Sequence, residues 1–316
     1  GLSVRCVKNP VPVVAPNVSV GYVSNIMMDE FTFNATVSSS GGAPVSSRGI
    51  VWSTSPNPTI DNNEGMITQG SGLGAFVCVA SGLTPNTTYY VRAFASNESQ
   101  TGYSGEQSPT TDFANCGTVT DIDGNIYQTV SIGSQCWMRS NLKTTKYTDN
   151  TPIVEVTDDL SWSELITPGY CWYNNDGPAN GIVYGALYNW YAIDFLKNGG
   201  RNLCPEGWHV PSISEWEILI DNNLYLKEIG SEHWYYYSGI TDQVTNEYGF
   251  TALPGGKRDD IGGDFLSMGS SAYWWSTSTY LSYWAYYCCM FESSTDVYCA
   301  SNESMEYGFS VRCLKD

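Results

Sequence analysis

The sequence predicts an all-β sandwich followed by an α+β domain with long loops, and three observations support this prediction. Between residues 17 and 112, apolar and polar residues alternate as they do in strands that bury one face. Beyond residue 113 the aromatic content rises, and ten of the eleven tryptophans lie there, all but Trp52. The clearest helix start, Ser212 followed by Glu215, also lies there. We therefore place a domain boundary at residues 110–114.

The chain begins with a repeat of its own end. Residues 1–8, Gly-Leu-Ser-Val-Arg-Cys-Val-Lys, match residues 308–315, Gly-Phe-Ser-Val-Arg-Cys-Leu-Lys, at six of eight positions. We assign residues 1–10 to the closing strand of a preceding repeat plus a linker. Either the chain is cut from a tandem array, which we favour, or this strand joins the sheet of a neighbouring molecule. Both interpretations predict head-to-tail self-association, with inter-unit contacts made by Gly1, Leu2, Val4 and Cys6.

The first domain is expected at residues 11–113, after a Pro-rich, semi-rigid connector. The alternating residues Phe31, Phe33, Ala35 and Val37 predict one strand, and residues 48–52 predict the next, with Trp52 pointing into the core.

Residues 83–93, Leu-x-Pro-x-Thr-x-Tyr-x-Val-x-Ala, resemble the corner of a fibronectin type III-like, Ig-like domain, with Tyr89 in the tyrosine-corner position. The resemblance implies a β-sandwich that serves as a spacer.

The second domain is expected to mix short strands and helices. Residues 118–131 predict a hairpin that turns at Asp123-Gly124-Asn125. Residues 185–198 predict a helix with Gly199 at its C-cap, because Leu187, Trp190, Tyr191 and Phe195 share one face.

The capping box of Ser212 and Glu215 predicts a second helix. Its apolar face, formed by Ile213, Trp216, Leu219 and Ile220, should pack on a sheet.

Strands are also expected near the end of the chain. Paired strands should run from 273 to 300, with the turn of the last hairpin at 293–296. The segment 307–314 predicts a half-buried closing strand, because Phe309, Val311 and Cys313 alternate with Ser310 and Arg312.

Charge and cysteine content limit the functional classes. The chain has 32 acidic against 14 basic residues, which argues against nucleic acid or an anionic membrane as a partner. It has no run of eighteen apolar residues, so we expect no membrane insertion. No signal peptide is visible, so we interpret the sequence as a mature product or a fragment. Ten cysteines indicate disulfides and an oxidising, extracellular compartment.

Several motifs in residues 114–316 resemble the Fibrobacter succinogenes major paralogous domain, a bacterial surface-protein family. They are Cys-Gly-Thr-Val-Thr-Asp at 116–121, Gln-Cys-Trp-Met at 135–138, Asn-Leu-Lys at 141–143, Trp-Tyr-Asn-Asn-Asp at 172–176, Leu-Tyr-Asn-Trp at 187–190, Cys-Pro-Glu-Gly-Trp-His-Val-Pro at 204–211, Ala-Leu-Pro-Gly-Gly at 252–256, Tyr-Trp-Trp-Ser at 273–276 and Gly-Phe-Ser-Val-Arg-Cys at 308–313. The resemblance implies an α+β domain similar to C-type lectins and formylglycine-generating enzymes. It brings no established activity.

Three disulfides are expected in this domain. Cys204 should pair with Cys313, closing a loop of roughly 100 residues for about 4 to 5 kcal/mol of stabilisation. Cys116 should pair with Cys136 across the first hairpin. Cys299 should pair with Cys288 or Cys289, and we assign Cys289. Cys171 is then open to pairing with the spare member of that couple, while Cys78 is either a buried thiol or a cross-link between neighbours.

Two kinds of ligand site are considered. Calcium could bind at one of three clusters of oxygen-bearing side chains, although turn chemistry also explains them. The clusters are Asp121, Asp123 and Asn125; Asn174, Asn175 and Asp176; and Asp259, Asp260 and Asp264. A glycan could stack on Trp234, Tyr236, Trp274 and Trp275.

The sequence contains no recognisable catalytic or metal motif around its two histidines, so we expect no enzyme. The expected function is that of a structural repeat unit in an extracellular bacterial surface fibre or filament. The alternative is a surface adhesin that binds carbohydrate through the lectin-like domain.

Overall fold

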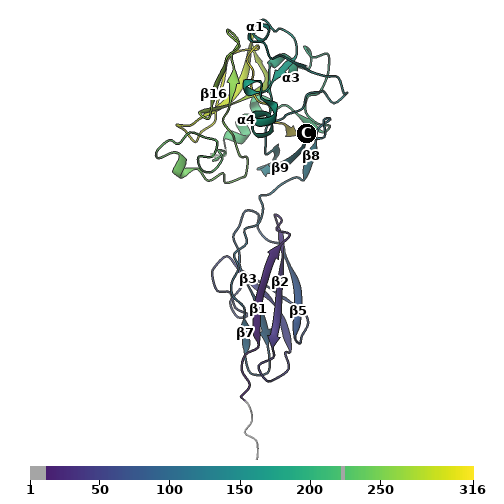
Figure 1. Cartoon of the computed structure of the whole chain (residues 1–316), viewed down its shortest axis with the longest axis vertical. Coiled ribbons are helices and arrows are strands. Elements are labelled where there is room, and N and C mark those ends of the chain that lie inside the picture. The colour runs from purple at the N-terminus through teal and green to yellow at the C-terminus, as the bar shows by residue number, and fades with distance from the viewer. Residues whose placement is uncertain (1–11, 222–224) are drawn as a thin grey trace, which may run out of the picture. The chain divides into compact units, whose positions relative to one another are not determined.

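The computed structural model describes residues 12–221 and 225–316, and the chain divides into two compact units (Figure 1). Unit 1 is Gly1–Phe113 and unit 2 is Ala114–Asp316. The division falls within the stretch where the composition of the sequence changes. Residues 1–10, assigned above to a closing strand and linker, lie outside the described residues.

Unit 1 is an Ig-like β-sandwich of two antiparallel sheets. One sheet has the order β1-β2-β5 and the other has the order β4-β3-β6-β7. The strands are β1 (Asn17–Ser24), β2 (Glu30–Ser39), β3 (Ser47–Ser53), β4 (Gly65–Thr68), β5 (Gly74–Ser81), β6 (Tyr90–Ser96) and β7 (Thr101–Tyr103).

The core of unit 1 follows the alternation in its sequence. All four apolar residues predicted on β2, from Phe31 to Val37, are buried, and so is Trp52 on β3. The hydroxyl of Tyr89 accepts a hydrogen bond of 3.0 Å from the backbone N–H of Thr84, which is the contact that defines a tyrosine corner. The sandwich prediction for this unit is confirmed.

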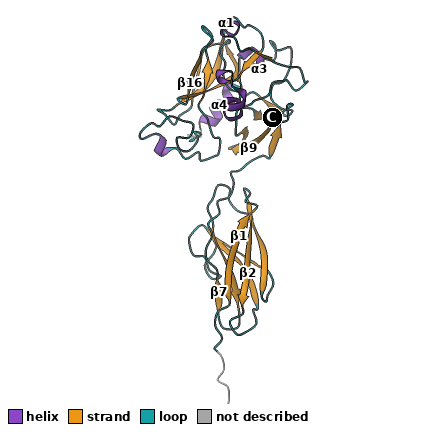
Figure 2. Cartoon of the chain, viewed as in Figure 1, coloured by secondary structure: helices purple, strands orange, loops and turns teal. Residues whose placement is uncertain are grey.

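Unit 2 contains short strands, few helical residues and long loops (Figure 2). Its α-helices are α1 (Asp159–Ser163), α2 (Ile182–Tyr184), α3 (Trp190–Ile193) and α4 (Ile213–Ile220), and its other helical turns are η1 (Tyr173–Asn175), η2 (Gly177–Gly181) and η3 (Thr241–Gln243). Its strands are β8 (Thr118–Thr120), β9 (Ile126–Ile132), β10 (Gln135–Met138), β11 (Val154–Glu155), β12 (Gly169–Cys171), β13 (Leu187–Tyr188), β14 (Trp208–His209), β15 (Gly255–Arg258), β16 (Phe265–Met268), β17 (Ser271–Tyr280), β18 (Trp284–Phe291), β19 (Tyr298–Ser304) and β20 (Leu314–Lys315).

Four sheets organise unit 2. The largest has five strands in the order β14-β20-β10-β9-β8, and the others are β11-β12-β13, β15-β16 and β17-β18-β19. The hairpin of β8 and β9 turns at Gly124, whose φ of +85° favours glycine. Both hydrogen bonds of the capping box of Ser212 and Glu215 are present at the start of α4, and this helix contacts β17 and β18. These predictions are confirmed.

The helix predicted over 185–198 is wrong for most of its length, because a short strand occupies its start and the chain leaves the helical conformation after one turn. Leu187 and Tyr188 form β13 and pair with β12, while only Trp190–Ile193 become helical. After α3 the chain turns outward, and Phe195, expected on the buried face, is 64% exposed. The helical spacing of apolar residues was therefore overridden by tertiary contacts.

Candidate functional site

The closing segment, residues 308–315, lies in the centre of unit 2. The backbone N–H of Tyr188 donates to the carbonyl of Phe309 (2.9 Å), and that of Leu142 donates to the carbonyl of Val311 (2.8 Å). The backbone N–H of Trp275, on β17, donates to the carbonyl of Ser310 (3.1 Å). The segment therefore joins elements that are far apart in the sequence, and β20 at its end pairs with β10 and β14.

The prediction of a half-buried strand is wrong for this segment, because both faces are covered. Phe309, Val311 and Cys313 are buried as expected, but Ser310 and Arg312 are buried as well. Ser310 lies against Asn141, whose Nδ2 donates to its hydroxyl (3.2 Å).

Arg312 is a fully buried cation held by neutral acceptors. Its guanidinium donates to Oδ1 of Asn141 from Nε (3.2 Å) and Nη2 (2.9 Å), and to the carbonyl of Phe250. The ring of Phe250 faces it at 4.2 Å. Burial lowers the pKa of Arg312, and the charge of Arg139 lowers it further. No ion pair of Arg312 with a carboxylate occurs among the described residues, so the segment depends on this one hydrogen-bonded arrangement.

Three disulfides occur in unit 2. Cys204 pairs with Cys313, and Cys116 pairs with Cys136, as expected. Cys299 pairs with Cys288, and not with Cys289 as assigned from the sequence. The strand register explains the difference, because Cys288 lies directly opposite Cys299, whereas Cys289 lies opposite Tyr298.

The remaining described cysteines, Cys78, Cys171 and Cys289, are buried free thiols. Burial raises the pKa of Cys78 and of Cys289 to about 11 and that of Cys171 to about 12. These thiols therefore stay protonated and unreactive at neutral pH. The pairing considered for Cys171 does not form. The predicted inter-unit contact residues Gly1, Leu2, Val4 and Cys6 lie outside the described residues.

Three of the four predicted glycan-binding rings are buried. Trp234, Trp274 and Trp275 are at most 2% exposed, and their indole N–H groups donate to partners inside the protein. These rings cannot stack on a ligand at the surface. Tyr236 is 60% exposed. Tyr235, Tyr237, Tyr283 and Trp284, which belong to the aromatic segments 234–237 and 283–287 of the sequence, are also exposed, and so is Tyr280.

The predicted calcium ligands are engaged in turns. Asp121 accepts hydrogen bonds from Asp123, Asn125 and Tyr127, and Asp123 accepts from Thr145 and forms an ion pair with Lys146. Oδ1 of Asp259 accepts two backbone N–H groups, including that of Asp264, and Oδ1 of Asp260 is buried without a hydrogen-bond partner. The structure therefore does not gather either set around one ion.

Among residues 12–221 and 225–316, one group of histidine and acidic side chains could surround an ion. It consists of Glu228, Glu232 and His233. The sequence did not predict this group.

Residues 130–315 match the family described as the Fibrobacter succinogenes major domain. The chain belongs to this family. The match covers the closing segment, Asn141 and both partners of the Cys204–Cys313 disulfide. It begins within β9, so Cys116 lies outside it and is tied to the major domain by its disulfide with Cys136.

Solved structures resemble only part of the chain, and the likeness is low. The sensor domain of the anti-sigma factor RsgI4 in Pseudobacteroides cellulosolvens is 15% identical, with 32% of this chain and 98% of that chain covered and a TM-score of 0.23. A computationally redesigned β-sandwich protein is 20% identical, with 32% and 97% covered and a TM-score of 0.23. We draw no conclusion from scores this low. No curated protein matches the sequence.

The three disulfides of the major-domain unit indicate folding in an oxidising, non-cytoplasmic compartment. Within the described part of the chain, no helix combines the length and apolarity needed to cross a membrane.

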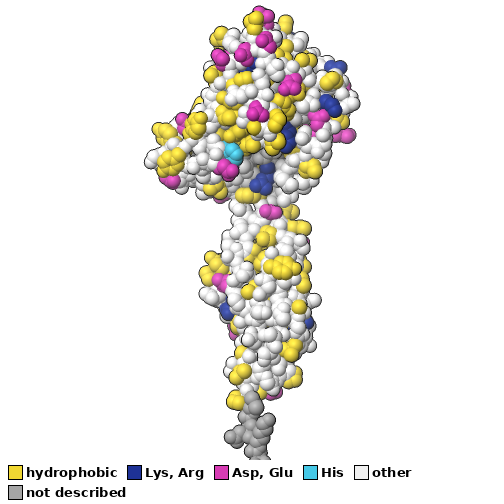
Figure 3. Space-filling model, viewed as in Figure 1, with side chains coloured by type: hydrophobic (Ala, Val, Ile, Leu, Met, Phe, Trp, Pro, Cys, Tyr) yellow, Lys and Arg dark blue, Asp and Glu magenta, His cyan; other side chains and the backbone are white. Residues whose placement is uncertain are grey.

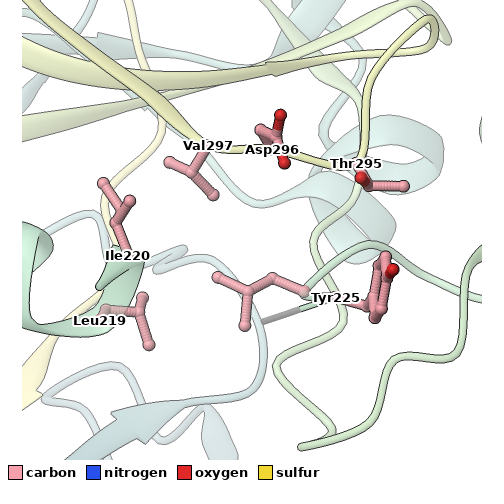
Figure 4. A pocket seen from close by; sticks show the side chains of 7 residues that line it. Leu219, Ile220, Tyr225, Thr295, Asp296 and Val297 are labelled. Carbon is pink, nitrogen blue, oxygen red and sulfur yellow. The ribbon is translucent and has the colours of Figure 1, made fainter. Parts of the chain in front are cut away.

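Unit 2 has a cavity beside α4 and another beside Trp172. A cavity of about 360 Å³ is lined by the end of α4 and the loop before β19, where Leu219, Ile220 and Val297 lie (Figure 4). A second cavity, of about 280 Å³, is lined by Trp172 together with Asp123, Asn125 and Lys143. Acidic side chains are interspersed with apolar ones on the face of unit 2 seen in Figure 3.

Proposed function

We propose that the chain is a structural repeat unit of an extracellular bacterial surface fibre, in which units associate head to tail. The observation that carries the proposal is the environment of the closing segment, considered together with its duplicate at residues 1–8. The duplicate keeps Ser, Val, Arg and Cys at the positions of the buried residues Ser310, Val311, Arg312 and Cys313.

Each of these side chains requires a specific partner. Arg312 needs the acceptor Oδ1 of Asn141, and Cys313 needs the thiol of Cys204. An arginine in a buried position without such acceptors would be costly. The corresponding Arg5 and Cys6 are therefore suited to a groove of the same chemistry.

The chain's own groove is already filled. Asn141 and Cys204 are engaged by residues 310–313 of the same unit. In this proposal the duplicate segment finds its partners in another copy of the major domain whose groove is not filled by its own closing segment. That copy is either the preceding repeat of a covalent array or a neighbouring molecule that gives its own closing segment to the next one. Contacts of this kind join different surfaces of successive copies, so they do not close on themselves and produce filaments.

The finer features of the proposal follow from the resemblances. Unit 1 serves as a fibronectin type III-like spacer, and unit 2 has a C-type-lectin-like fold. The net charge of −18 keeps the surface acidic and the fibre soluble.

The test uses material that keeps its native neighbours. We expect elongated particles in negative-stain images, and peptide mapping without reduction should join Cys6 to the Cys204 position of another copy. Cys78, which is free and buried, is the internal control and should be recovered unlinked. Isolated monomers, with Cys6 unlinked, would contradict the proposal.

A carbohydrate-binding adhesin remains the second candidate, and the cavity beside Trp172 favours it. The cavity combines an indole with carboxylate, amide and ammonium groups, a mixture typical of sugar sites. A glycan array tests this function. Selective binding should be lost in Trp172→Ala and kept in Trp284→Ala, which removes an exposed ring away from the cavity.

A further inference from the structure

The two histidines of the chain meet carboxylates in different ways. His209 has one carboxylate on each ring nitrogen, with Asp316 at 2.6 Å from Nδ1 and Glu215 at 3.0 Å from Nε2. In contrast, Nδ1 of His233 has both oxygens of Glu228 on one side, at 2.8 and 2.9 Å. The carboxylates around His209 therefore lie on opposite edges of the ring, where one ion cannot reach both together with a nitrogen.

Around His233 the ligand atoms converge. Glu228, Glu232 and His233 each offer one ligand atom, and these atoms all lie within 4.8 Å of one another. Ligands that share a zinc ion at about 2.0–2.2 Å lie roughly 3.5 Å apart in a tetrahedral site. Glu232 is exposed, so its side chain is free to close the remaining gap.

The segment that carries these ligands is anchored at both ends. Before it, the buried ammonium of Lys227 donates to the carbonyls of Phe291 and Ser294, both at 2.7 Å. After it, the indole of Trp234 is buried and donates to the carbonyl of Ala252 at 2.9 Å. Residues 228–233 are thus held as a short loop between two fixed points, which limits the entropy lost when a ligand binds.

The charge of the cluster also favours a cation. Two of its three side chains, Glu228 and Glu232, are carboxylates, the kind of group that attracts a cation. Among the described residues, no Lys or Arg forms an ion pair with Glu228 or Glu232. Lys227, the nearest in sequence, directs its ammonium to backbone carbonyls and to the ring of Trp234 at 4.2 Å.

We propose that Glu228, Glu232 and His233 bind one zinc ion. Imidazole nitrogen and carboxylate oxygen are both zinc ligands, and three protein ligands leave a fourth position for water. Calcium is a poorer match, because it requires six to eight oxygen ligands and the cluster presents a nitrogen. This inference does not depend on the proposed role in a fibre.

The test is calorimetric titration of the full chain with Zn²⁺, after treatment with a chelator and with the disulfides intact. We expect one ion per chain. His233→Gln and Glu228→Gln should each weaken binding by at least about 100-fold, which exceeds the roughly 10- to 100-fold cost of losing an outer-shell partner. The matched control His209→Gln should bind as the wild type does.

Two further measurements distinguish zinc binding at this cluster from zinc binding at a cysteine and from loss of the fold in the variant. Substitution by Co²⁺ should give the visible bands of nitrogen and oxygen ligation without a thiolate charge-transfer band, which excludes the three free cysteines. Circular dichroism of His233→Gln should match the wild type, because glutamine keeps a donor for Glu228. Absence of binding, equal loss in His209→Gln, a thiolate band, or equally tight Ca²⁺ binding would each overturn the proposal.

Discussion

In unit 1 most of the core side chains come from the strands of two regular sheets, whereas in unit 2 many of them come from loops and short strands joined by three disulfides. Within residues 12–113 the one cysteine is the free thiol Cys78. Regular sheets satisfy their backbone groups within the ladder. Loops need side chains and cross-links for the same purpose, so unit 2 relies on Asn141, Arg312 and Cys204.

The comparison predicts that cross-links matter most in unit 2. The double variant Cys204→Ala/Cys313→Ala should lower the free energy of unfolding of unit 2 by about 5 kcal/mol, since the disulfide closes a long loop. Urea denaturation followed by tryptophan fluorescence reports on unit 2, because ten of the eleven tryptophans lie there.

The control for this variant removes a disulfide that closes a shorter loop in the same unit. Cys116→Ala/Cys136→Ala, with a sequence separation of 20 against 109, should cost about 3 kcal/mol. Equal losses in the two variants would show that loop length does not set the effect. Hydrogen exchange in unit 1 should be unchanged in both.

The second prediction concerns the buried cation. Arg312→Met keeps the length of the side chain but leaves Oδ1 of Asn141 and the carbonyl of Phe250 short of donors, which should cost about 3 kcal/mol. Lys315→Met removes the same charge from an exposed position of the same segment and should change stability by less than about 0.5 kcal/mol. Similar unfolding midpoints for the two variants would contradict the role given to Arg312.

The third prediction applies to unit 1. Tyr89→Phe removes the acceptor for the N–H of Thr84 and should cost about 1 kcal/mol, a typical value for one hydrogen bond. Hydrogen exchange should locate the loss in unit 1. Tyr90→Phe, on the less buried neighbour, is the control, and a loss as large as that of Tyr89→Phe would remove the tyrosine corner as the explanation.

The smallest effect is expected from the capping box of α4. Burial alone would raise the pKa of Glu215, but hydrogen bonds from Ser212 and His209 outweigh it and hold the pKa below its usual value. A lowered pKa in the folded state means that the carboxylate contributes stability above its unfolded pKa, and that this stability is lost as the pH falls through the folded value. Glu215→Gln should therefore be less stable than the wild type at pH 7 by about 1 kcal/mol or less.

The difference between the wild type and Glu215→Gln should shrink as the pH falls below about 4.3, the ordinary pKa of glutamate, and on through the lower pKa of the folded state. Chemical denaturation between pH 3 and 7 measures it. Glu217→Gln, on the same helix and exposed, should show no such trend, and a parallel trend in both variants would argue against the capping box.

Prediction from the sequence succeeded where the relevant contacts are local or periodic. The alternation on β2, the tyrosine corner at Tyr89 and the capping box at Ser212 depend on residues a few positions apart. The two correct disulfides followed from their positions next to predicted elements. The choice between Cys288 and Cys289 needed the strand register, which the sequence does not contain.

The candidate site was harder to predict, since burial in unit 2 is decided by distant segments. Trp274 and Trp275 are adjacent on β17, so their side chains point to opposite faces of the strand. Both are buried, because Trp216 of α4 packs on Trp274 and Phe309 of the closing segment packs on Trp275. The spacing of Glu228, Glu232 and His233 in the sequence matches no metal-binding motif considered above. Their ligand atoms lie close together in a loop that Lys227 and Trp234 anchor at its two ends.

By itself, the sequence determined the sandwich of unit 1, the position of the domain boundary, the family resemblance and the duplication of the closing octapeptide. All four are properties of composition, order and periodicity along the chain. Only the tertiary structure decided that the closing segment is buried on both faces, that Arg312 is held by Asn141, and that two carboxylates converge on His233. The first two features depend on side chains up to about 170 positions apart, and no local pattern encodes contacts over such separations. The third depends on distant carbonyl groups that fix Lys227 and Trp234 on either side of a short loop.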